Sequence, residues 1–369
     1  MSNTKYLTLV ITHQCNLNCT YCYEKHKDDK VMTFEQAVEI LDAELNSNDD
    51  YDNVEICLLG GEPLLEFDLI ERIVEYTKKQ TYMKSFYFFI STNGTLLDEY
   101  RKRWFWDNRK YVQMGLSLDG TKNMHDRNRC GSFDKIDINF FVKCYPEQGI
   151  KMTVSNETIQ NLAEGVIYCY DLGFNNVSCN LAFGIDWSNA ENDRVFAEHL
   201  KKLVNFYVQN PKIKPCSLLD AELLVNISQA ENKNLKVCGS GRGTTAYDFD
   251  GKQYPCQFFL PLSLGEETAK LALELDLSQD EIPTVSMDSK CISCCLRNIC
   301  STCYGANYAA TGNIYHHDLS MCRLMKIQYF ATAALVLELY EQDLLNSFDQ
   351  RTKAAIVKSA LLIVDSVSI

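Results

Sequence analysis

Four features are missing from this 369-residue sequence, and each absence narrows the kind of protein it encodes. No cluster of basic residues interrupts the net charge of −13, which comes from 36 Lys and Arg residues against 49 Asp and Glu residues. Such a balance disfavours tight nucleic-acid binding. No apolar run is long enough to span a bilayer, and residues 1–5 lack the apolar segment of a secretory signal. We therefore expect a cytoplasmic protein that binds neither a nucleic acid nor a membrane.

A long linker rich in glycine and serine is absent as well, so we expect domains that pack together rather than swing freely. The length allows one full domain with a sizeable core and a smaller second one. Four regions are predicted: a first domain at residues 1–210, a bridging region at 211–237, a cysteine-rich domain at 238–322 and a helical segment at 323–369.

Cysteine, by contrast, is abundant, with 17 residues of this type. In a chain without a secretory signal, so many cysteines indicate metal sites more than disulfides. Three of them, Cys15, Cys19 and Cys22, follow an alternating apolar run at residues 6–11 that predicts a strand. They therefore fall in a loop at the C-terminal end of that strand.

Three thiolates at this spacing suit an iron–sulfur cluster, which binds soft sulfur ligands. A cubane of four irons would keep one iron without a protein ligand, open to a substrate or a cofactor. Two alternatives stay open at this point. One is a zinc site with His13 or His26 as the fourth ligand, and the other is a group of buried structural cysteines.

The chain then alternates between predicted helices and strands. Thr33 and Gln36 form a capping box ahead of the first helix. Further strands are predicted at 54–59, 86–90, 111–116, 150–154 and 176–181, and helices at 67–79, 133–144 and 162–172. Six such β–α units imply an α/β fold with a parallel sheet. Every strand ends in small, polar or glycine residues, at the rim where such folds keep their chemistry.

Beyond the sixth strand, helical patterns are predicted at 191–208, 218–225, 327–345 and 354–364. His316 and His317 are adjacent, so their side chains face apart, and a solvated loop is the favoured interpretation over a metal pair. Arg127 and Arg129 are predicted either to meet a carboxylate or to lie in a solvated loop.

The strand predicted at 54–59 ends in four residues that place a carboxylate between residues that break regular structure: Gly60, Gly61, Glu62 and Pro63. They would share a rim with the cysteine loop. The C-x3-C-x2-C spacing, the aromatic Tyr21 before its last cysteine and this Gly-Gly-Glu-Pro segment resemble the signature of the radical S-adenosylmethionine (SAM) enzymes.

The resemblance implies a partial (β/α)6 TIM-like barrel with an open side. It also implies a [4Fe–4S] cluster on the three cysteines and the reductive cleavage of S-adenosylmethionine to a 5′-deoxyadenosyl radical. The residues implied for SAM binding are Tyr21, Gly60, Gly61, Glu62, Pro63, Asn93 and Ser117. Glu62 would pair with the ammonium group of SAM, whereas for Asn93 a turn-forming role is the alternative.

A second group of cysteines begins at Cys238. Asp250 and Gly251 signal a tight hairpin that presents Cys256 on a returning strand. Because C-x2-C pairs also bind zinc, a zinc ribbon is one alternative for this region. The pattern resembles the SPASM domain of peptide-modifying radical SAM enzymes, which holds two auxiliary [4Fe–4S] clusters and brings the expected total to three.

By that resemblance, one auxiliary cluster lies farther from the SAM site and one lies nearer. The distal cluster is assigned to Cys291, Cys294, Cys300 and Cys322. The nearer cluster is assigned to Cys238, Cys256 and Cys303, with Cys295 as the candidate fourth ligand. Without Cys295, one iron stays open to a substrate cysteine. Only two residues separate Cys300 from Cys303, where the common pattern has three.

Segments at 115–122, 124–129, 162–166 and 303–308 resemble a narrower group, the maturases of CXXX-repeat peptides, which belong to the thioether-forming ranthipeptide and sactipeptide synthases. This resemblance implies a ribosomally made, Cys-containing precursor peptide as the substrate and an external low-potential electron donor. Only 14 residues precede Cys15, so we expect leader recognition without an N-terminal winged-helix element.

Other functions stay open at this stage. Formylglycine formation, as in the similar sulfatase-maturing enzymes, is disfavoured because Gln257 stands where those enzymes carry a general-base Asp, and an amide is a poor base. C–C cyclophane cross-linking or epimerisation of a peptide, a non-enzymatic iron–sulfur electron carrier and a tRNA-modifying enzyme are the remaining alternatives. The sequence does not identify the peptide, the residue attacked, a catalytic side chain or the oligomeric state.

Overall fold

The computed structural model describes residues 3–225, 227, 236, 238–279, 288–300, 302–345 and 348–367. Their contacts divide the chain into two units. Unit 1 lies within Met1–Leu118, His125–Ile150 and Gly239–Gln279, and unit 2 within Asp119–Met124, Lys151–Cys238 and Asp280–Ile369. Most of the predicted bridging region beyond residue 225 lies outside the described residues, as does 280–287. The predicted domain bounds therefore stay a prediction.

A mostly parallel sheet forms the centre of unit 1. Its strands run in the order β4-β3-β2-β1-β7-β8. They are β1 (Thr4–Thr12), β2 (Asn53–Gly60), β3 (Ser85–Thr92), β4 (Val112–Ser117), β7 (Thr244–Tyr247) and β8 (Gln253–Tyr254). The first four confirm the predicted strands. The predicted hairpin is β7–β8, and β7 pairs in parallel with β1, a neighbour that the six predicted units did not include.

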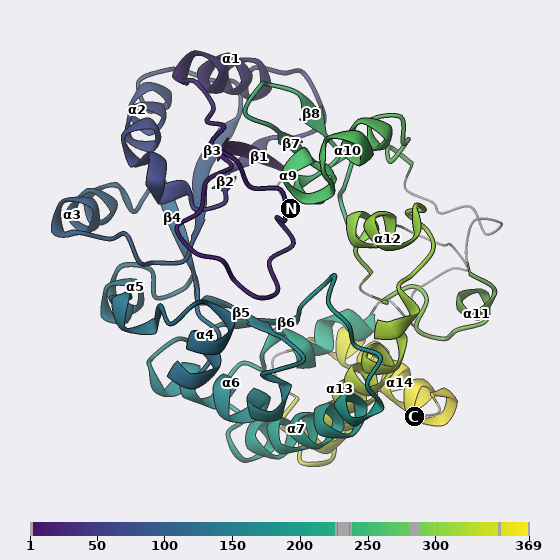
Figure 1. Ribbon diagram of the computed structural model, residues 1–369. Coiled ribbons are helices and arrows are strands. Elements are labelled where there is room, and N and C mark those ends of the chain that lie inside the picture. Colours follow the sequence, from purple (N-terminus) through teal and green to yellow (C-terminus); the bar gives the residue numbers. More distant parts are fainter. Residues whose placement is uncertain are drawn as a thin grey trace. The chain divides into compact units, whose positions relative to one another are not determined.

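Helices cover one face of this sheet, and along β2 every second side chain is buried. These include Val54, Ile56 and Leu58, which are fully buried. The helices of unit 1 are α1 (Phe34–Leu45), α2 (Phe67–Thr77), α3 (Glu99–Asn108), α5 (Ile138–Cys144), α9 (Pro261–Leu264) and α10 (Glu266–Ala272). Figure 1 shows α1, α2 and α3 along the outer side of the strands. The predicted capping box of Thr33 and Gln36 is present at α1.

Unit 2 contains two neighbouring strands, β5 (Ile150–Val154) and β6 (Val177–Leu181), as predicted. Its longer helices are α6 (Leu162–Asp171), α7 (Ala190–Gln209), α12 (Tyr304–Thr311), α13 (Cys322–Glu341) and α14 (Gln350–Ser366). The short helix α4 (Lys122–Asn128) begins in unit 2 and ends in unit 1. On α7, the predicted apolar face is buried, including Phe196, Leu200 and Leu203.

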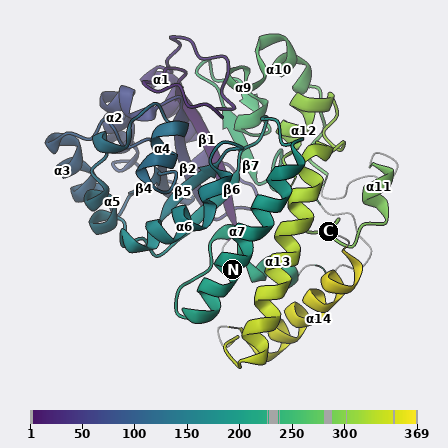
Figure 2. The same ribbon diagram turned by 60° about the horizontal axis from the view of Figure 1, so that its bottom comes forward.

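The C-terminal helices α13 and α14 pack side by side in unit 2, as Figure 2 shows. Tyr329 and Val336 of α13 and Ile356 and Ile363 of α14 share one buried cluster. The last two predicted helices are thereby confirmed, each with an earlier start than the sequence indicated.

Two predicted helices differ from the structure. Residues 133–144 form a 3₁₀ turn at Phe133–Lys135 and then α5, which begins at Ile138 because the Asp137 carboxylate accepts from the backbone N–H of Phe140 and caps it. The pattern at 218–225 forms two 3₁₀ turns, Ser217–Leu219 and Ala221–Leu224. Asp220 stands between them and caps the second turn, so a continuous helix does not form.

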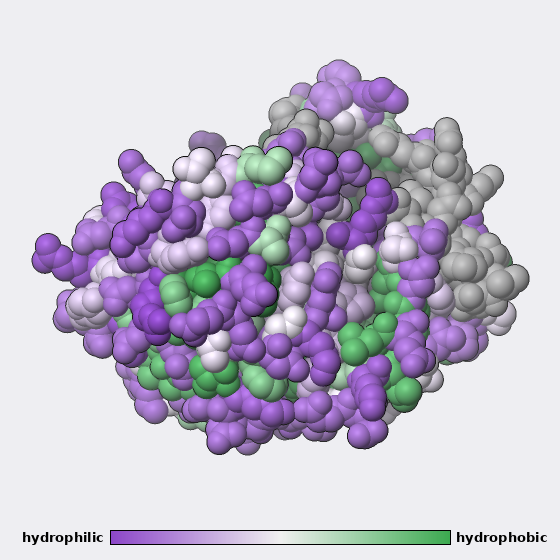
Figure 3. All heavy atoms as spheres, turned by 90° about the horizontal axis from the view of Figure 1, so that it is seen from above, coloured by the Kyte–Doolittle hydropathy of each residue, from purple (hydrophilic) through white to green (hydrophobic). Residues whose placement is uncertain are grey.

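Among the helices that the structure describes, none combines the length and the apolar character needed to cross a membrane. On the face drawn in Figure 3, hydrophilic residues predominate and hydrophobic ones gather in small separate groups. Large hydrophobic side chains that stay exposed include Met83, Leu271 and Leu361.

Candidate active site

The cysteine loop leaves the end of β1 and lies directly against the end of β2. The backbone N–H groups of Gly61 and Glu62 donate to the carbonyl oxygens of Thr12 and Gln14, at 3.1 and 2.8 Å. A Cβ atom on Gly60 would lie 2.0 Å from the Thr12 oxygen, and one on Gly61 would lie 2.2 Å from the Gln14 oxygen. Both glycines are therefore required for the close approach of the cysteine loop to this strand end.

Glu62 is a buried carboxylate with an exposed fraction of only 1%. Its two oxygens accept from the Thr92 hydroxyl at 2.7 Å, the Asn93 backbone N–H at 2.8 Å and the Leu64 backbone N–H at 3.1 Å. Burial raises its pKa, while these hydrogen bonds and the charge of Arg129 oppose the rise. The protein thus fixes one acidic group in a dry position at the rim of the sheet.

Asn93 connects this carboxylate to the cysteine loop. Its side-chain amide donates to the Asn16 side-chain oxygen at 2.8 Å, and Asn16 in turn donates to the Thr95 hydroxyl at 2.9 Å. The Asn93 side-chain oxygen also accepts from the Thr95 backbone N–H. The turn-forming role that the sequence left open is therefore present, together with a bridge between the end of β3 and the loop.

The three predicted cluster cysteines lie on this loop, and electrostatic effects show their proximity. Burial raises the pKa of the Cys15 thiol to about 11, and the negative charges of Glu62 and Cys19 contribute to the rise. Lys27 donates from its Nζ to the Cys22 sulfur at 3.2 Å and to the Glu24 carbonyl oxygen at 3.0 Å. Lys27 also interacts with the charge of Cys15, so one ammonium group lies near two of the thiols.

Tyr21, the aromatic residue before the last cysteine, packs against a buried arginine. The Arg129 guanidinium lies over the Tyr21 ring at 5.5 Å, and Arg129 is 8% exposed. The backbone N–H of Thr20 donates to the Asn128 carbonyl oxygen at 3.0 Å. The solvated-loop interpretation of Arg129 is therefore wrong, and this side chain belongs to the surroundings of the cysteine loop.

The remaining predicted SAM-binding residues also lie at strand ends in unit 1. Ser117 is the last residue of β4 and is half-buried. Pro63 begins the 3₁₀ turn Pro63–Glu66 directly after Glu62. The model of the Radical SAM superfamily matches residues 9–201 of this chain. The chain belongs to the radical SAM superfamily.

Similar proteins include characterised and uncharacterised members. An uncharacterized protein of Methanocaldococcus jannaschii is 31% identical over 235 residues, which cover 60% of this chain and 80% of that protein. A cysteine-type anaerobic sulfatase-maturating enzyme of Clostridium perfringens is 32% identical over 172 residues, which cover 42% of this chain and 45% of that enzyme.

Solved structures share the fold. Native anSMEcpe with bound AdoMet and Kp18Cys peptide has a TM-score of 0.71 at 21% identity, covering 92% of this chain and 99% of that one. Streptococcus suis SuiB bound to its precursor peptide SuiA has a TM-score of 0.54 at 16% identity, covering 86% and 75%. The superfamily fold is thus present along most of the chain.

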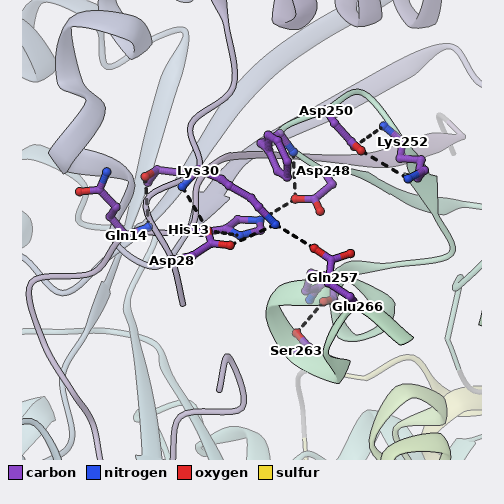
Figure 4. Close-up of polar contacts among 12 residues, drawn as sticks. His13, Gln14, Asp28, Lys30, Asp248, Asp250, Lys252, Gln257, Ser263 and Glu266 are labelled. Carbon is purple, nitrogen blue, oxygen red and sulfur yellow. Dashed lines mark hydrogen bonds and ion pairs between the residues drawn. The ribbon is translucent and has the colours of Figure 1, made fainter. Parts of the chain in front are cut away.

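In this radical SAM protein, a polar network fixes the start of the cysteine loop (Figure 4). The buried His13 ring lies 2.7 Å from an Asp248 oxygen and 2.9 Å from an Asp28 oxygen. Burial lowers the pKa of His13, but the hydrogen bonds and charges of Asp248 and Asp28 together outweigh this effect and raise the pKa. Lys30 continues the network to Glu266 of α10 at 2.8 Å. Segments far apart in the sequence are thereby joined within unit 1.

An aromatic pair links the first cysteine loop to the segment of Cys256. The rings of Tyr23 and Phe258 stack with a centroid separation of 4.2 Å. Burial raises the pKa of Tyr23 well above its usual value, and the charges of Glu24, Cys22, Cys57 and Cys256 add to this. Cys256 lies two residues after β8 and begins a 3₁₀ turn. Tyr23 is therefore near both Cys22 and Cys256.

In unit 2, the four cysteines predicted for the distal cluster lie near one another. Burial raises the pKa of Cys300 to about 12, and the negative charges of Cys294, Cys291 and Cys322 contribute. Burial likewise raises the pKa of Cys291 to about 11, with contributions from Asp288, Cys294 and Cys322. Cys322 is the first residue of α13. Cys291 and Cys300 thus each interact with the charges of Cys294 and Cys322, and the grouping of the four around one cluster stays a prediction.

His317, which the sequence analysis placed in a solvated loop, lies beside this group. Its Nδ1 is 3.9 Å from the Cys291 sulfur, and its backbone N–H donates to an Asp288 oxygen at 3.0 Å. Burial lowers its pKa below the usual value. The adjacent His316 is exposed, so the prediction that the two side chains face different surroundings is confirmed and only the environment of His317 is corrected.

The thiols predicted for the nearer auxiliary cluster belong to both units. Cys256 lies in unit 1, whereas Cys238, Cys295 and Cys303 lie in unit 2. The Cys303 sulfur caps α12 by accepting from the Ala306 backbone N–H, and Cys295 packs against the core formed by α13 and α14. Their grouping around one cluster stays a prediction.

All 17 cysteines lie within the described ranges, and none of them forms a disulfide. In the same ranges, no three His, Cys, Asp or Glu side chains are placed to hold a single metal ion. The cysteines that hold a cubane bind different irons, so their sulfurs stand farther apart than the ligands of one ion.

Proposed function

We propose that this radical SAM enzyme cleaves AdoMet reductively and modifies a ribosomally made, Cys-containing precursor peptide, forming thioether cross-links. The observation that carries the proposal is the position of Glu62. A buried carboxylate, held by three hydrogen bonds, lies beside a loop with three thiols. An acidic group so desolvated suits an ammonium partner, and the α-amino group of AdoMet supplies one.

The residues of the loop fit a [4Fe–4S] cluster bound by Cys15, Cys19 and Cys22. Three soft sulfur ligands leave one iron for a chelating substrate. A cluster and AdoMet, when bound, supply a low-potential electron and a carbon-centred radical that removes hydrogen from the peptide. The protein's own contribution is orientation and the exclusion of water.

Each rim residue has a distinct proposed role. Glu62 would bind the ammonium group, and Gly60 and Gly61 allow the cysteine loop to lie directly against the end of β2. Arg129, buried over Tyr21, places a positive charge that suits a carboxylate. Ser117, at the end of β4, is proposed to contact the ribose, and Tyr21 to border the adenine. Asn93 and Pro63 fix the surrounding backbone.

The second group of cysteines is proposed to hold two auxiliary [4Fe–4S] clusters, as in a SPASM domain. The effects of the Cys294 and Cys322 charges on Cys291 and Cys300, together with the position of Cys322 at the start of α13, support a common distal cluster. For the nearer cluster we propose Cys238, Cys256 and Cys303 as ligands, with Cys295 as the candidate fourth. An external low-potential donor would reduce the first cluster.

Peptide modification is supported by the fold shared with structures that contain peptides. Forming a thioether breaks one C–H and one S–H bond and makes one C–S bond. The hydrogen atom would go to the AdoMet-derived radical, the thiol proton to solvent and the remaining electron to an auxiliary cluster. The product peptide therefore loses two hydrogens per cross-link and keeps its sulfur. The test incubates the anaerobically reconstituted enzyme with a Cys-containing candidate precursor, AdoMet and a reductant. Mass spectrometry should show that loss together with the disappearance of free thiols. AdoMet cleavage with an unchanged peptide mass would contradict the proposed peptide reaction.

Formylglycine formation is the second candidate, favoured by the identity with sulfatase-maturating enzymes. It predicts a different product, because the cysteine sulfur leaves the peptide and an aldehyde appears. Gln257 follows Cys256 in this chain, and an amide does not accept a proton near neutral pH. Loss of sulfur, detected by the same mass measurement, would replace the thioether proposal by this one.

A further inference from the structure

Lys27 has a charged side chain that directly contacts a sulfur of the first cysteine loop. Its Nζ lies 3.2 Å from the Cys22 sulfur, within hydrogen-bonding range for a sulfur acceptor. The same Nζ donates to the Glu24 carbonyl oxygen at 3.0 Å, which fixes the ammonium group over the loop. Its side chain is half-buried, whereas that of Lys25, two residues earlier, is exposed.

The position of this charge matters because iron–sulfur clusters respond to their surroundings. Net charge, hydrogen bonds to sulfur and solvent exposure set the reduction potential of a given cluster type. Reduction adds one negative charge to the cluster and its thiolates. A fixed ammonium group on one of the sulfurs stabilises the more negative state, and partial burial keeps solvent from screening it.

We propose that Lys27 is a positioning residue that donates a charge-assisted hydrogen bond to the Cys22 thiolate and stabilises the reduced form of the first cluster. This inference rests on the proposed function, because it requires a cluster on Cys15, Cys19 and Cys22. Lys27 acts through Cys22 and does not touch AdoMet. Its charge makes the first reduction easier for the external electron donor.

The test compares Lys27→Met with the matched control Lys25→Met, which removes the same charge from the same loop at an exposed position. Each protein is reconstituted as the full chain, and its iron and sulfide contents are measured. An EPR-monitored redox titration then follows the signal that changes when AdoMet is added, which assigns it to the first cluster. We expect the midpoint potential of Lys27→Met to shift to a more negative value and that of Lys25→Met to stay at the wild-type value.

A conservative variant separates charge from shape. Lys27→Arg keeps a donor with a positive charge, so the midpoint potential of its first cluster should lie near that of the wild type. Lys27→Gln keeps a donor without charge, so its midpoint potential should shift to a more negative value. If Lys27→Met does not load the cluster, Lys27→Gln takes its place in the titration. The inference is overturned if the uncharged variant has the wild-type potential, or if a loading defect of Lys27→Met and Lys27→Gln is not rescued by Lys27→Arg.

The outcome also distinguishes this inference from the proposed function. If the wild-type protein yields no [4Fe–4S] signal that responds to AdoMet, the proposed function fails. A normal AdoMet-responsive signal whose potential is insensitive to Lys27 removes only the role of Lys27.

Discussion

The two cysteine regions are held in place by different kinds of structure. Cys15, Cys19 and Cys22 follow a nine-residue strand that has neighbours on both sides, and a glycine pair and a buried carboxylate lie against their loop. The thiols of the distal group lie on short turns between Asp288 and Cys300 and at the start of α13. The sheet therefore positions the first group, whereas a few local turns position the second.

The largest effect should separate the two regions by function. Cys15→Ala removes a thiol at the proposed AdoMet site, so AdoMet cleavage should fall below detection. Cys322→Ala removes one from the distal group and should retain cleavage while losing peptide modification. Each variant should lose about four irons per chain. The measurements are AdoMet consumption and iron content per chain. A loss of AdoMet cleavage in both variants would contradict the separate functions of the two cysteine groups. Cys57→Ala, outside both groups, serves as the control.

A second prediction concerns Glu62, the buried carboxylate beside the first cysteine loop. Glu62→Gln keeps the shape of the side chain but removes its charge. We expect AdoMet binding to weaken roughly ten- to a hundredfold, because a hydrogen bond to a charged group contributes about 1.5–3 kcal/mol. Isothermal titration calorimetry of the reconstituted proteins measures the affinity for AdoMet. Glu66→Gln, four residues later, should bind like the wild type, and equal weakening in both would contradict the assignment.

A third prediction tests whether the sheet positions the first region. Gly60→Ala places a methyl group on a backbone with φ of +154° and against the Thr12 oxygen at 2.0 Å. We expect a loss of about 1–3 kcal/mol in the free energy of unfolding, as for other overpacked sites. Gly251 has a φ of +81°, but a Cβ atom added there would have no atom within 4 Å. Gly251→Ala should therefore lower the free energy of unfolding by less. Urea unfolding of both variants measures their losses in the free energy of unfolding. A larger loss for Gly251→Ala than for Gly60→Ala would contradict close packing at Gly60.

The smallest effect concerns unit 2, which contains the distal group. Nδ1 of His199 on α7 accepts from the Ala163 backbone N–H at 3.2 Å, and burial lowers the pKa of this ring. The folded state therefore favours the neutral His199 ring. Its contribution to stability is fully present at pH values above the pKa of the unfolded state, near 6.5. It is lost as the pH falls toward the lower pKa of the folded state.

When the pH is lowered from 7.5 to 5.5, we expect the free energy of unfolding of the wild type, measured by urea unfolding, to decrease by roughly 1 kcal/mol. A pKa difference of one unit between the folded and unfolded states corresponds to about 1.4 kcal/mol. His199→Gln should flatten that part of the profile. An unchanged slope in the variant would assign the dependence to other groups.

The strands of unit 1 and the position of the cysteine loop at the end of β1 could be predicted because the signals there are local. The alternating run at 6–11, the capping box at Thr33 and the Gly-Gly-Glu-Pro segment each depend on neighbours in the sequence. The predicted helix at 133–144 begins too early, because the Asp137 cap sets the start of α5 at Ile138. An acidic residue before an apolar run is a signal that could have located it.

Contacts between distant segments could not be predicted from the sequence. The pairing of β7 with β1 joins Thr244 to Tyr6 across most of the chain, and no local pattern encodes it. The same holds for the stacking of Tyr23 on Phe258 and for His317 beside Cys291. The contact of Lys27 with Cys22 is closer in sequence, but a lysine five residues after a cysteine is too common a spacing to be informative.

The place of β7 in the sheet also determines how the chain can be shortened. A fragment that ends after the sixth β–α unit would lack β7, and the backbone groups of Tyr6–Leu9 that pair with it would become an open edge. Unpaired edges of this kind invite association with other chains. We therefore expect the N-terminal 210 residues, expressed alone, to aggregate, and a fragment fused to residues 239–279 to remain monodisperse.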